Sequence, residues 1–255
     1  MPIEIVTIPC LQDNYAFLIH SPETGKTALV DAPEAAAISS ALEERRWSLD
    51  AIWITHHHGD HVDGVDTLRA AHRCPVVGAA NDAHRLPKLD LEVGDGSIFD
   101  FEGHEVRVID VSGHTVGHIA FHIPDAKAAF TADSLMALGC GRVFEGSFAM
   151  MWDGLCKLKE LPAHTWIYSG HEYTAANAKF AMTIEPKNSD LVSRVRDVNA
   201  RRAENAPTVP SLLSEELATN PFLRADSPIL KAAVDMRTAS DIDVFTEIRR
   251  RKDRF

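Results

Sequence analysis

Residues 55–61 read THHHGDH and place four histidines and one aspartate within seven positions. The stretch follows the apolar run AIWI (51–54), which predicts a strand, and it precedes a helix expected to begin near Gly64. Alternation along an extended chain sends His56 and His58 to the same side. A strand that ends in such a loop brings several ligand-type side chains to one point, so the sequence predicts a metal site there.

Further ligand-type residues complete this pattern. Asp60 and His61 come one turn later and are expected to face a second point close by. Imidazole and carboxylate ligands together suit Zn, Fe or Mn. Three more residues follow predicted strands: His114 in VSGHTVGH, Asp133 after AAFTA and His171 after TWIY. Two adjacent metals that share one carboxylate would use seven such ligands, and the candidates are His56, His58, Asp60, His61, His114, Asp133 and His171.

The chain changes character near residue 172. Short apolar runs before it predict strands at 3–8, 15–19, 27–30, 51–54, 106–109, 119–123, 128–131 and 165–168. Helices are expected between some of them, at 34–46 (with Pro33 in its first turn), 64–73 and 150–161. Only helices are expected afterwards, at 173–184, 190–205, 211–219, 227–236 and 240–251. We therefore predict two domains, 1–171 and 172–255.

Composition narrows the function classes. The 255 residues carry a formal net charge of −11, which argues against sequence-independent nucleic-acid binding. No apolar run reaches the roughly 18 residues that span a membrane, and the N-terminal MPIEIVTIPC shows no secretory pattern. The four cysteines are far apart, so a cytoplasmic protein without disulfides is expected. Residues 1–171 hold 12 basic and 24 acidic side chains (−12), whereas 172–255 hold 14 and 13 (+1).

The pattern H-x-H-x-D-H, followed by His, Asp and His, resembles the metallo-β-lactamase superfamily. That resemblance implies an α+β fold, an αββα sandwich with its metals at one edge of the two sheets, followed here by a smaller all-helical C-terminal domain. It implies two divalent metal ions per chain, with Zn first and Fe or Mn as alternatives. By the same resemblance the first ion would be held by His56, His58 and His114, the second by Asp60, His61 and His171, and Asp133 would bridge them.

Later motifs narrow the resemblance to glyoxalase II, the hydroxyacylglutathione hydrolases. They are DNYAFLI (13–19), GCGRVFEG (139–146), GHEYT (170–174), IEPKN (184–188), NPFLR (220–224) and RRRKD (249–253). The resemblance implies hydrolysis of S-(2-hydroxyacyl)glutathione, chiefly S-D-lactoylglutathione, to D-lactate and glutathione, the second step of methylglyoxal detoxification. It implies substrate contacts from Arg142, Phe144, Tyr173, Arg249 and Lys252. Phe144 carries no hydroxyl, where the family can have Tyr, so it can only pack or stack.

A dinuclear site explains how a thioester would be cleaved without a serine or cysteine nucleophile. Two ions about 3.5–4 Å apart can hold a bridging hydroxide and polarise the carbonyl. The leaving thiolate has a free pKa of about 8.5 and needs little protonation. Asp60 and Asp133 are the expected catalytic residues, and the partner is a small glutathione thioester bound by a monomer.

Three alternatives remain open. One is another hydrolase of this fold, acting on lactones, β-lactams or phosphodiesters, which would not explain residues 172–255. The second is a persulfide dioxygenase with one iron, and the third is a binding protein with a structural metal, although structural zinc sites are usually closed and four-coordinate. His57 and His118 are expected outside the ligand set. Asp31 is either a partner of a ligand imidazole or a plain strand-end carboxylate, and Cys140 is expected to be a small buried residue.

Overall fold

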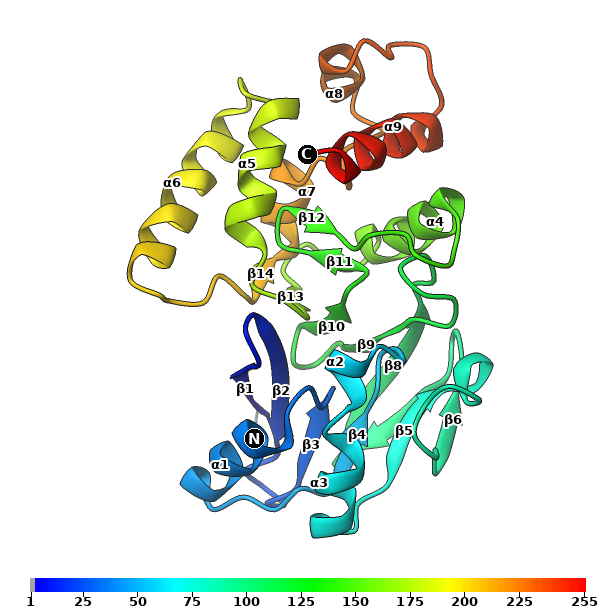
Figure 1. Cartoon of the computed structure of the whole chain (residues 1–255), viewed down its shortest axis with the longest axis vertical. Coiled ribbons are helices and arrows are strands. Elements are labelled where there is room, and N and C mark those ends of the chain that lie inside the picture. The colour runs from blue at the N-terminus through cyan, green and yellow to red at the C-terminus, as the bar shows by residue number, and fades with distance from the viewer. Residues whose placement is uncertain (1–2) are drawn as a thin grey trace. The chain divides into compact units, whose positions relative to one another are not determined.

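The computed structural model describes residues 3–255, and the chain forms two compact units. Unit 1 comprises the residues up to Asp110 together with Thr115–Thr131, and unit 2 comprises Val111–His114 together with Ala132–Phe255. Figure 1 traces both along the chain. The predicted domains, 1–171 and 172–255, are delimited by the change from strand-like to helical sequence and not by contacts within the fold. They stay a prediction. Among the described residues, no helix combines the length and apolar character needed to cross a membrane.

The first sheet of unit 1 has six strands in chain order (Figure 1): β1 Glu4–Cys10, β2 Asn14–His20, β3 Thr27–Val30, β4 Ala51–Trp53, β5 Val76–Ala79 and β6 Leu91–Val93. The first three pair antiparallel, and β3 to β6 pair parallel. Parallel neighbours need crossover connections, which here contain α1 Ala35–Arg45 after β3, and α2 Gly59–Val62 and α3 Val65–His72 after β4. The carboxyl ends of β3 and β4 therefore meet at one edge, where Asp31 and the 55–61 loop begin.

The second sheet contributes four antiparallel strands to unit 1, in the order β10-β9-β8-β7. Their bounds are β7 Ile98–Phe101, β8 His104–Asp110, β9 Ile119–Ile123 and β10 Ala128–Ala132. The side chain of Trp53, from the first sheet, contacts the rings of Phe99, Phe101 and Phe121, from the second, at centroid distances of 5.2–5.5 Å. Buried aromatic side chains contribute much of the apolar area in a core, so these contacts join the two sheets into a sandwich.

Unit 2 is mainly helical. Its helices are α4 Phe148–Lys159, α5 Thr174–Ile184, α6 Ser189–Ala203, α7 Leu213–Thr219, α8 Pro228–Ala233 and α9 Asp241–Asp253. Four of them begin at a side-chain N-cap, which satisfies otherwise orphaned amides, and the caps are Ser147, Asn188, Ser227 and Ser240. Its short strands are β11 Leu135–Met136, β12 Gly139–Cys140, β13 Trp166–Ser169 and β14 Ser211–Leu212.

The observed elements confirm the α+β class and the helical character of residues 172–255, with local corrections. The predicted helix at 211–219 was wrong at its start, because Ser211 and Leu212 pair with β13 as strand β14. Pro33 does not lie in the first turn of α1, since Glu34 is the N-cap and the helix begins at Ala35. The prediction also missed the short strands β5, β6, β7, β11 and β12, whose two to four residues give too little periodicity.

The sandwich core can be tested at Trp53, of which 1% is exposed. We expect Trp53→Ala to lower the free energy of unfolding by about 3–5 kcal/mol, because it removes a large buried ring. Trp166→Ala is the matched control, since 43% of Trp166 is exposed; it should cost about 1 kcal/mol or less. Urea unfolding of both variants measures the difference, and equal losses would contradict this account of the core.

Candidate metal centre

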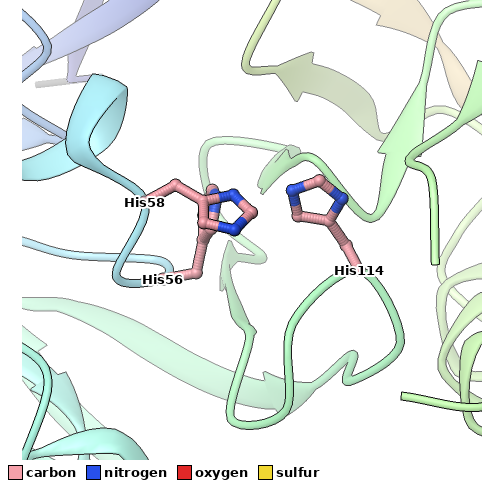
Figure 2. Close-up of side chains that lie close together, drawn as sticks. All are labelled: His56, His58 and His114. Carbon is pink, nitrogen blue, oxygen red and sulfur yellow. The ribbon is translucent and has the colours of Figure 1, made fainter. Parts of the chain in front are cut away.

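The seven candidate ligands are divided between the two units. Unit 1 carries His56, His58, Asp60 and His61 in the loop after β4 and in α2. Unit 2 carries His114 in the loop after β8, Asp133 directly after β10, and His171 after β13. All seven therefore stand at or near strand ends, as the sequence pattern predicts. Figure 2 shows the side chains of His56, His58 and His114.

In unit 1, the carboxylate of Asp31 organises the loop. It accepts hydrogen bonds from the backbone amide of Thr55 (2.9 Å) and from the Thr55 hydroxyl (2.8 Å). The same carboxylate lies 2.8 Å from Nδ1 of His61. Asp31, His56 and His61 offer ligand-type atoms that all lie within 4.8 Å of one another. Of the two interpretations left open by the sequence, this geometry favours Asp31 as the partner of an imidazole.

These contacts also assign the imidazole nitrogens of unit 1. Because the Thr55 hydroxyl donates its proton to Asp31, it can only accept from Nδ1 of His56, which lies 3.0 Å away. His61 likewise donates from Nδ1 to the Asp31 carboxylate. A hydrogen bond at one ring nitrogen fixes the tautomer and presents the other nitrogen to a metal. Both buried histidines therefore present Nε2 as the ligand atom.

Asp60 is held from the adjacent strand. The buried side chain of Asn14, the first residue of β2, donates from Nδ2 to the Asp60 carbonyl and to its carboxylate, each at 3.0 Å. The Asp60 side chain is 42% exposed, so its carboxylate is accessible while one of its oxygens is held. Sequence reasoning missed Asn14 and Thr55, although both lie inside quoted motifs, because their partners are set by tertiary contacts.

In unit 2, the Asp133 carboxylate lies between two histidines. Its Oδ2 is 3.4 Å from Nε2 of His114 and 3.3 Å from Nε2 of His171. His114 donates from Nδ1 to the backbone carbonyl of Arg142 at 2.8 Å, so its Nε2 is again the nitrogen that would bind a metal. All three ligand candidates are buried. The bridging role of Asp133 stays a prediction, and this carboxylate contacts both imidazoles that it would connect through the ions.

Aromatic side chains accompany these histidines. The Tyr173 ring stacks on His171 with centroids 4.6 Å apart and planes 6° from parallel. Phe144 contacts His114 edge-on at 5.3 Å, while 61% of its surface stays exposed. The Arg142 guanidinium lies 5.8 Å from the Phe144 ring centroid. Three of the five predicted substrate contacts thus gather around the histidines of unit 2.

The other two predicted substrate contacts lie on α9 and differ in exposure. Arg249 is only 5% exposed, and it donates to the Cys140 carbonyl and to Asp253, each at 2.9 Å. Lys252 is less buried, with its ammonium 5.2 Å from the Phe180 ring centroid. Burial, followed by the nearby Arg249 charge, lowers the pKa of Lys252. Much of the hydrogen-bonding capacity of Arg249 is therefore used inside unit 2, and its role as a substrate contact stays a prediction.

The residues assigned no ligand role have other partners. His57 lies 2.8 Å from the buried Asp82 through Nδ1. The buried His118 ring stacks on His56 at a centroid distance of 4.5 Å. Cys140 is buried, and this burial raises the pKa of its thiol to about 11. A neutral thiol is a poor nucleophile, so Cys140 is poorly suited to supply the attacking group.

Comparisons with known proteins agree with this picture. The family model described as "Hydroxyacylglutathione hydrolase C-terminus" matches residues 172–255, and the model described as "Metallo-beta-lactamase superfamily" matches residues 12–171. Relatives named hydroxyacylglutathione hydrolase from Roseobacter denitrificans and Ruegeria pomeroyi are 63% and 60% identical over 255 residues, 100% of each chain. The crystal structure of the BLEG-1 B3 metallo-beta-lactamase shares the fold, with a TM-score of 0.67 at 18% identity, covering 86% of this chain and 99% of its own. The chain belongs to the hydroxyacylglutathione hydrolase family of the metallo-β-lactamase superfamily.

Proposed function

We propose that this chain hydrolyses S-(2-hydroxyacyl)glutathione, chiefly S-D-lactoylglutathione, to the 2-hydroxy acid and glutathione. The observation that carries this proposal is the full-length identity of 60–63% to relatives named for that reaction. The match of a family-specific model to residues 172–255 favours this hydrolase over lactone, β-lactam or phosphodiester hydrolases of the same fold. The reaction is the second step of methylglyoxal detoxification.

The donor set fits two divalent ions. His56, His61 and His114 have their Nδ1 atoms engaged, so each presents Nε2, and Asp133 faces two imidazoles. We propose that the first ion is held by His56, His58 and His114, the second by Asp60, His61 and His171, and that Asp133 bridges them. When bound, such a pair of ions activates a water molecule and polarises the thioester carbonyl. Zn is the proposed metal, and Fe or Mn suit the same donors.

The protein's own groups complete the reaction. Asp60 is half-exposed and held by Asn14, and we propose that its carboxylate orients the attacking water. The departing glutathione thiolate, with a free pKa of about 8.5, needs little protonation. The cations of Arg142, Arg249 and Lys252 match the net negative charge of glutathione, whereas the −12 balance of residues 1–171 would repel it. We further propose that the enzyme is a monomer and that it acts in the cytoplasm, a reducing compartment in which four free cysteines are expected.

The direct test is hydrolysis of S-D-lactoylglutathione by the purified protein, with metal analysis of the same sample. We expect thioester cleavage and two ions per chain, with no oxygen consumption. Oxygen uptake with a glutathione persulfide, together with one iron per chain, would instead support the dioxygenase alternative. A metal-loaded protein that cleaves neither compound would refute the proposal.

The shared carboxylate gives the first prediction on the ligands. Asp133→Ala should lower the occupancy of both metals, because a bridging carboxylate offsets the repulsion between two dications. His171→Ala should deplete mainly one ion. His57→Ala, which changes a histidine bonded to Asp82 instead, is the matched control and should retain both. Elemental analysis measures the number of ions per chain in each variant. Loss of a single ion in Asp133→Ala would contradict the bridging role.

The basic residues of α9 give a second prediction. Lys252→Ala should raise KM for the glutathione thioester and leave metal content unchanged. A lost charged hydrogen bond costs about 1.5–3 kcal/mol when shielded, or roughly tenfold or more in kcat/KM, and the effect should shrink at high salt. Arg251→Ala is the control, because Arg251 pairs with Glu247 at 2.9 Å. Equal effects on a small thioester without glutathione's carboxylates would show that Lys252 does not bind the substrate.

The Cys140 thiol gives a third prediction. Because its pKa is raised to about 11, its thiolate is scarce at pH 8 and increases as the pH rises towards that value. Alkylation at pH 8 should modify the more exposed Cys156 first, and activity should survive. Mass spectrometry locates the label. Stoichiometric inactivation through Cys140, with the metals retained, would indicate a cysteine acyl-enzyme.

A further inference from the structure

Residues 133–142 of unit 2 form a short loop, here called the ligand hairpin, whose two ends touch the metal ligands. Strands β11 and β12 pair within it, and the Gly141 amide donates to the Ser134 carbonyl at 3.3 Å. One end is Asp133, and the other is Arg142, whose carbonyl accepts from Nδ1 of His114. The position of this hairpin therefore sets both the carboxylate and the orientation of the imidazole.

The backbone at the hairpin's second end packs closely on both ligands. A Cβ atom at Gly141 would lie 1.9 Å from the Asp133 carbonyl oxygen and 3.0 Å from Nδ1 of His114. Two non-glycine residues also hold left-handed conformations: Ala132, just before the hairpin, with φ 40°, and Leu138, at its turn, with φ 57°. Such conformations persist where the surrounding structure over-determines them. A hairpin with two residues in each strand needs that outside support.

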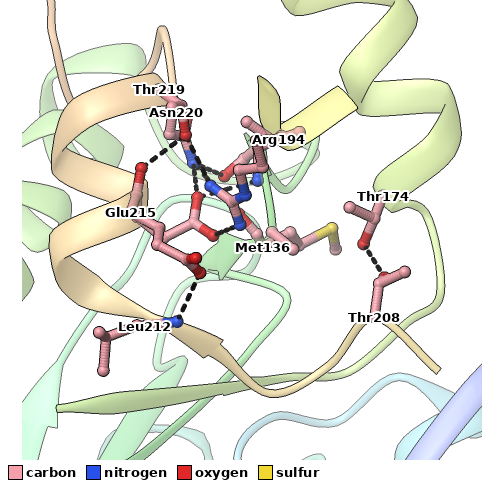
Figure 3. Close-up of polar contacts among 12 residues, drawn as sticks. Met136, Thr174, Arg194, Thr208, Leu212, Glu215, Thr219 and Asn220 are labelled. Carbon is pink, nitrogen blue, oxygen red and sulfur yellow. Dashed lines mark hydrogen bonds and ion pairs between the residues drawn. The ribbon is translucent and has the colours of Figure 1, made fainter. Parts of the chain in front are cut away.

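Side chains from the helical part of unit 2 supply the support. Asn220 donates from Nδ2 to the Met136 carbonyl at 3.1 Å and to the Gly139 carbonyl at 2.9 Å, one on each strand. Glu216 accepts from the Leu138 amide at 2.9 Å and from Asn220 at 3.0 Å. Figure 3 labels Met136, Asn220 and Arg194 in this region, and Arg194 pairs with Glu216. Asn220 and Glu216 are fully buried.

Two more donors complete the set. Asn177, on α5, donates to the Ala137 carbonyl at 3.1 Å, and Arg249, on α9, donates to the Cys140 carbonyl at 2.9 Å. The carbonyls of residues 136, 137, 139 and 140 thus all accept from side chains at least 40 positions away. A buried carbonyl that loses its donor pays a desolvation penalty, so the hairpin's position depends on these side chains.

We propose that Asn220, with Glu216, is a positioning residue for the metal ligands Asp133 and His114 and acts through the ligand hairpin. This inference rests on the proposed function for the presence of the metals. It assigns the 172–255 region a second task besides contacting glutathione, which is to hold the ligand geometry of unit 2. Asn220 is central because its single amide bridges both hairpin strands.

The test compares two asparagines that each donate from Nδ2 to backbone carbonyls, Asn220 at the end of α7 and Asn188 at the start of α6. Asn220→Ala removes both donations to the hairpin. Asn188→Ala is the matched control, because Asn188 donates to the Ala218 carbonyl at 2.9 Å and caps α6 without touching the hairpin. Metal affinity is measured by competition with a chelator, the ligand field by the absorption spectrum of the Co²⁺-substituted protein, and stability by thermal unfolding.

We expect Asn220→Ala to weaken metal binding by about tenfold or more, in the range known for partners of metal ligands. Its Co²⁺ spectrum should shift, and kcat should fall more than KM rises. Asn188→Ala should lower the unfolding temperature and leave affinity and spectrum unchanged. Asn177→Ala removes one donor at the hairpin turn, so it should weaken metal binding less than Asn220→Ala does. It replaces Asn220→Ala in the test if that variant does not fold.

Wild-type affinity and spectrum in Asn220→Ala, or in Asn177→Ala where only that variant folds, would overturn the inference. An equal loss of affinity in Asn188→Ala would do the same, because it would indicate general destabilisation. Failure of the proposed function is distinguishable, since the unaltered protein would then lack the metals or the thioesterase activity.

Discussion

The hydrogen bond at Nδ1 of three buried histidines proposed as ligands, His56, His61 and His114, is the constraint on which the proposed site depends. In unit 1 the Asp31 carboxylate holds Thr55 and His61, and Thr55 in turn accepts from His56. In unit 2 the Arg142 carbonyl takes the same role for His114. Each bond fixes a tautomer, so the nitrogen that would bind metal is determined before any ion arrives.

The surrounding fold of unit 1 positions the groups that form these hydrogen bonds. The parallel pairing of β3 and β4 puts Asp31 and Thr55 at the same sheet edge, where a carboxylate can reach the loop. Asp31 itself adopts a left-handed conformation, with φ 56°, which turns the chain sharply out of the strand. The sandwich core behind this edge, centred on Trp53, keeps the strand ends in place. In unit 2 the residue that accepts from His114 lies at the end of the ligand hairpin, and side chains that are distant in the sequence hold this hairpin.

The sequence was sufficient for the fold class, the family and the list of candidate ligands, because those ligands lie in short motifs at strand ends. It was not sufficient to identify the residues that hold the candidate ligands in place. Asn14 holds Asp60 across 46 positions and Asn220 holds Gly139 across 81, and no local periodicity reports such contacts. Helical spacing predicts that Arg249 and Lys252 share a face. It gives no information on the burial of Arg249 or on its hydrogen bond to the Cys140 carbonyl. The identity of the metal and the individual ligand roles stay predictions.

The most direct measurement of the central claim is a metal titration of the metal-free enzyme while hydrolysis of S-D-lactoylglutathione is followed. If the seven side chains proposed as ligands bind two ions, the rate should rise until two equivalents per chain are bound and then level off. Full activity at one equivalent, or activity that does not depend on added metal, would contradict the account.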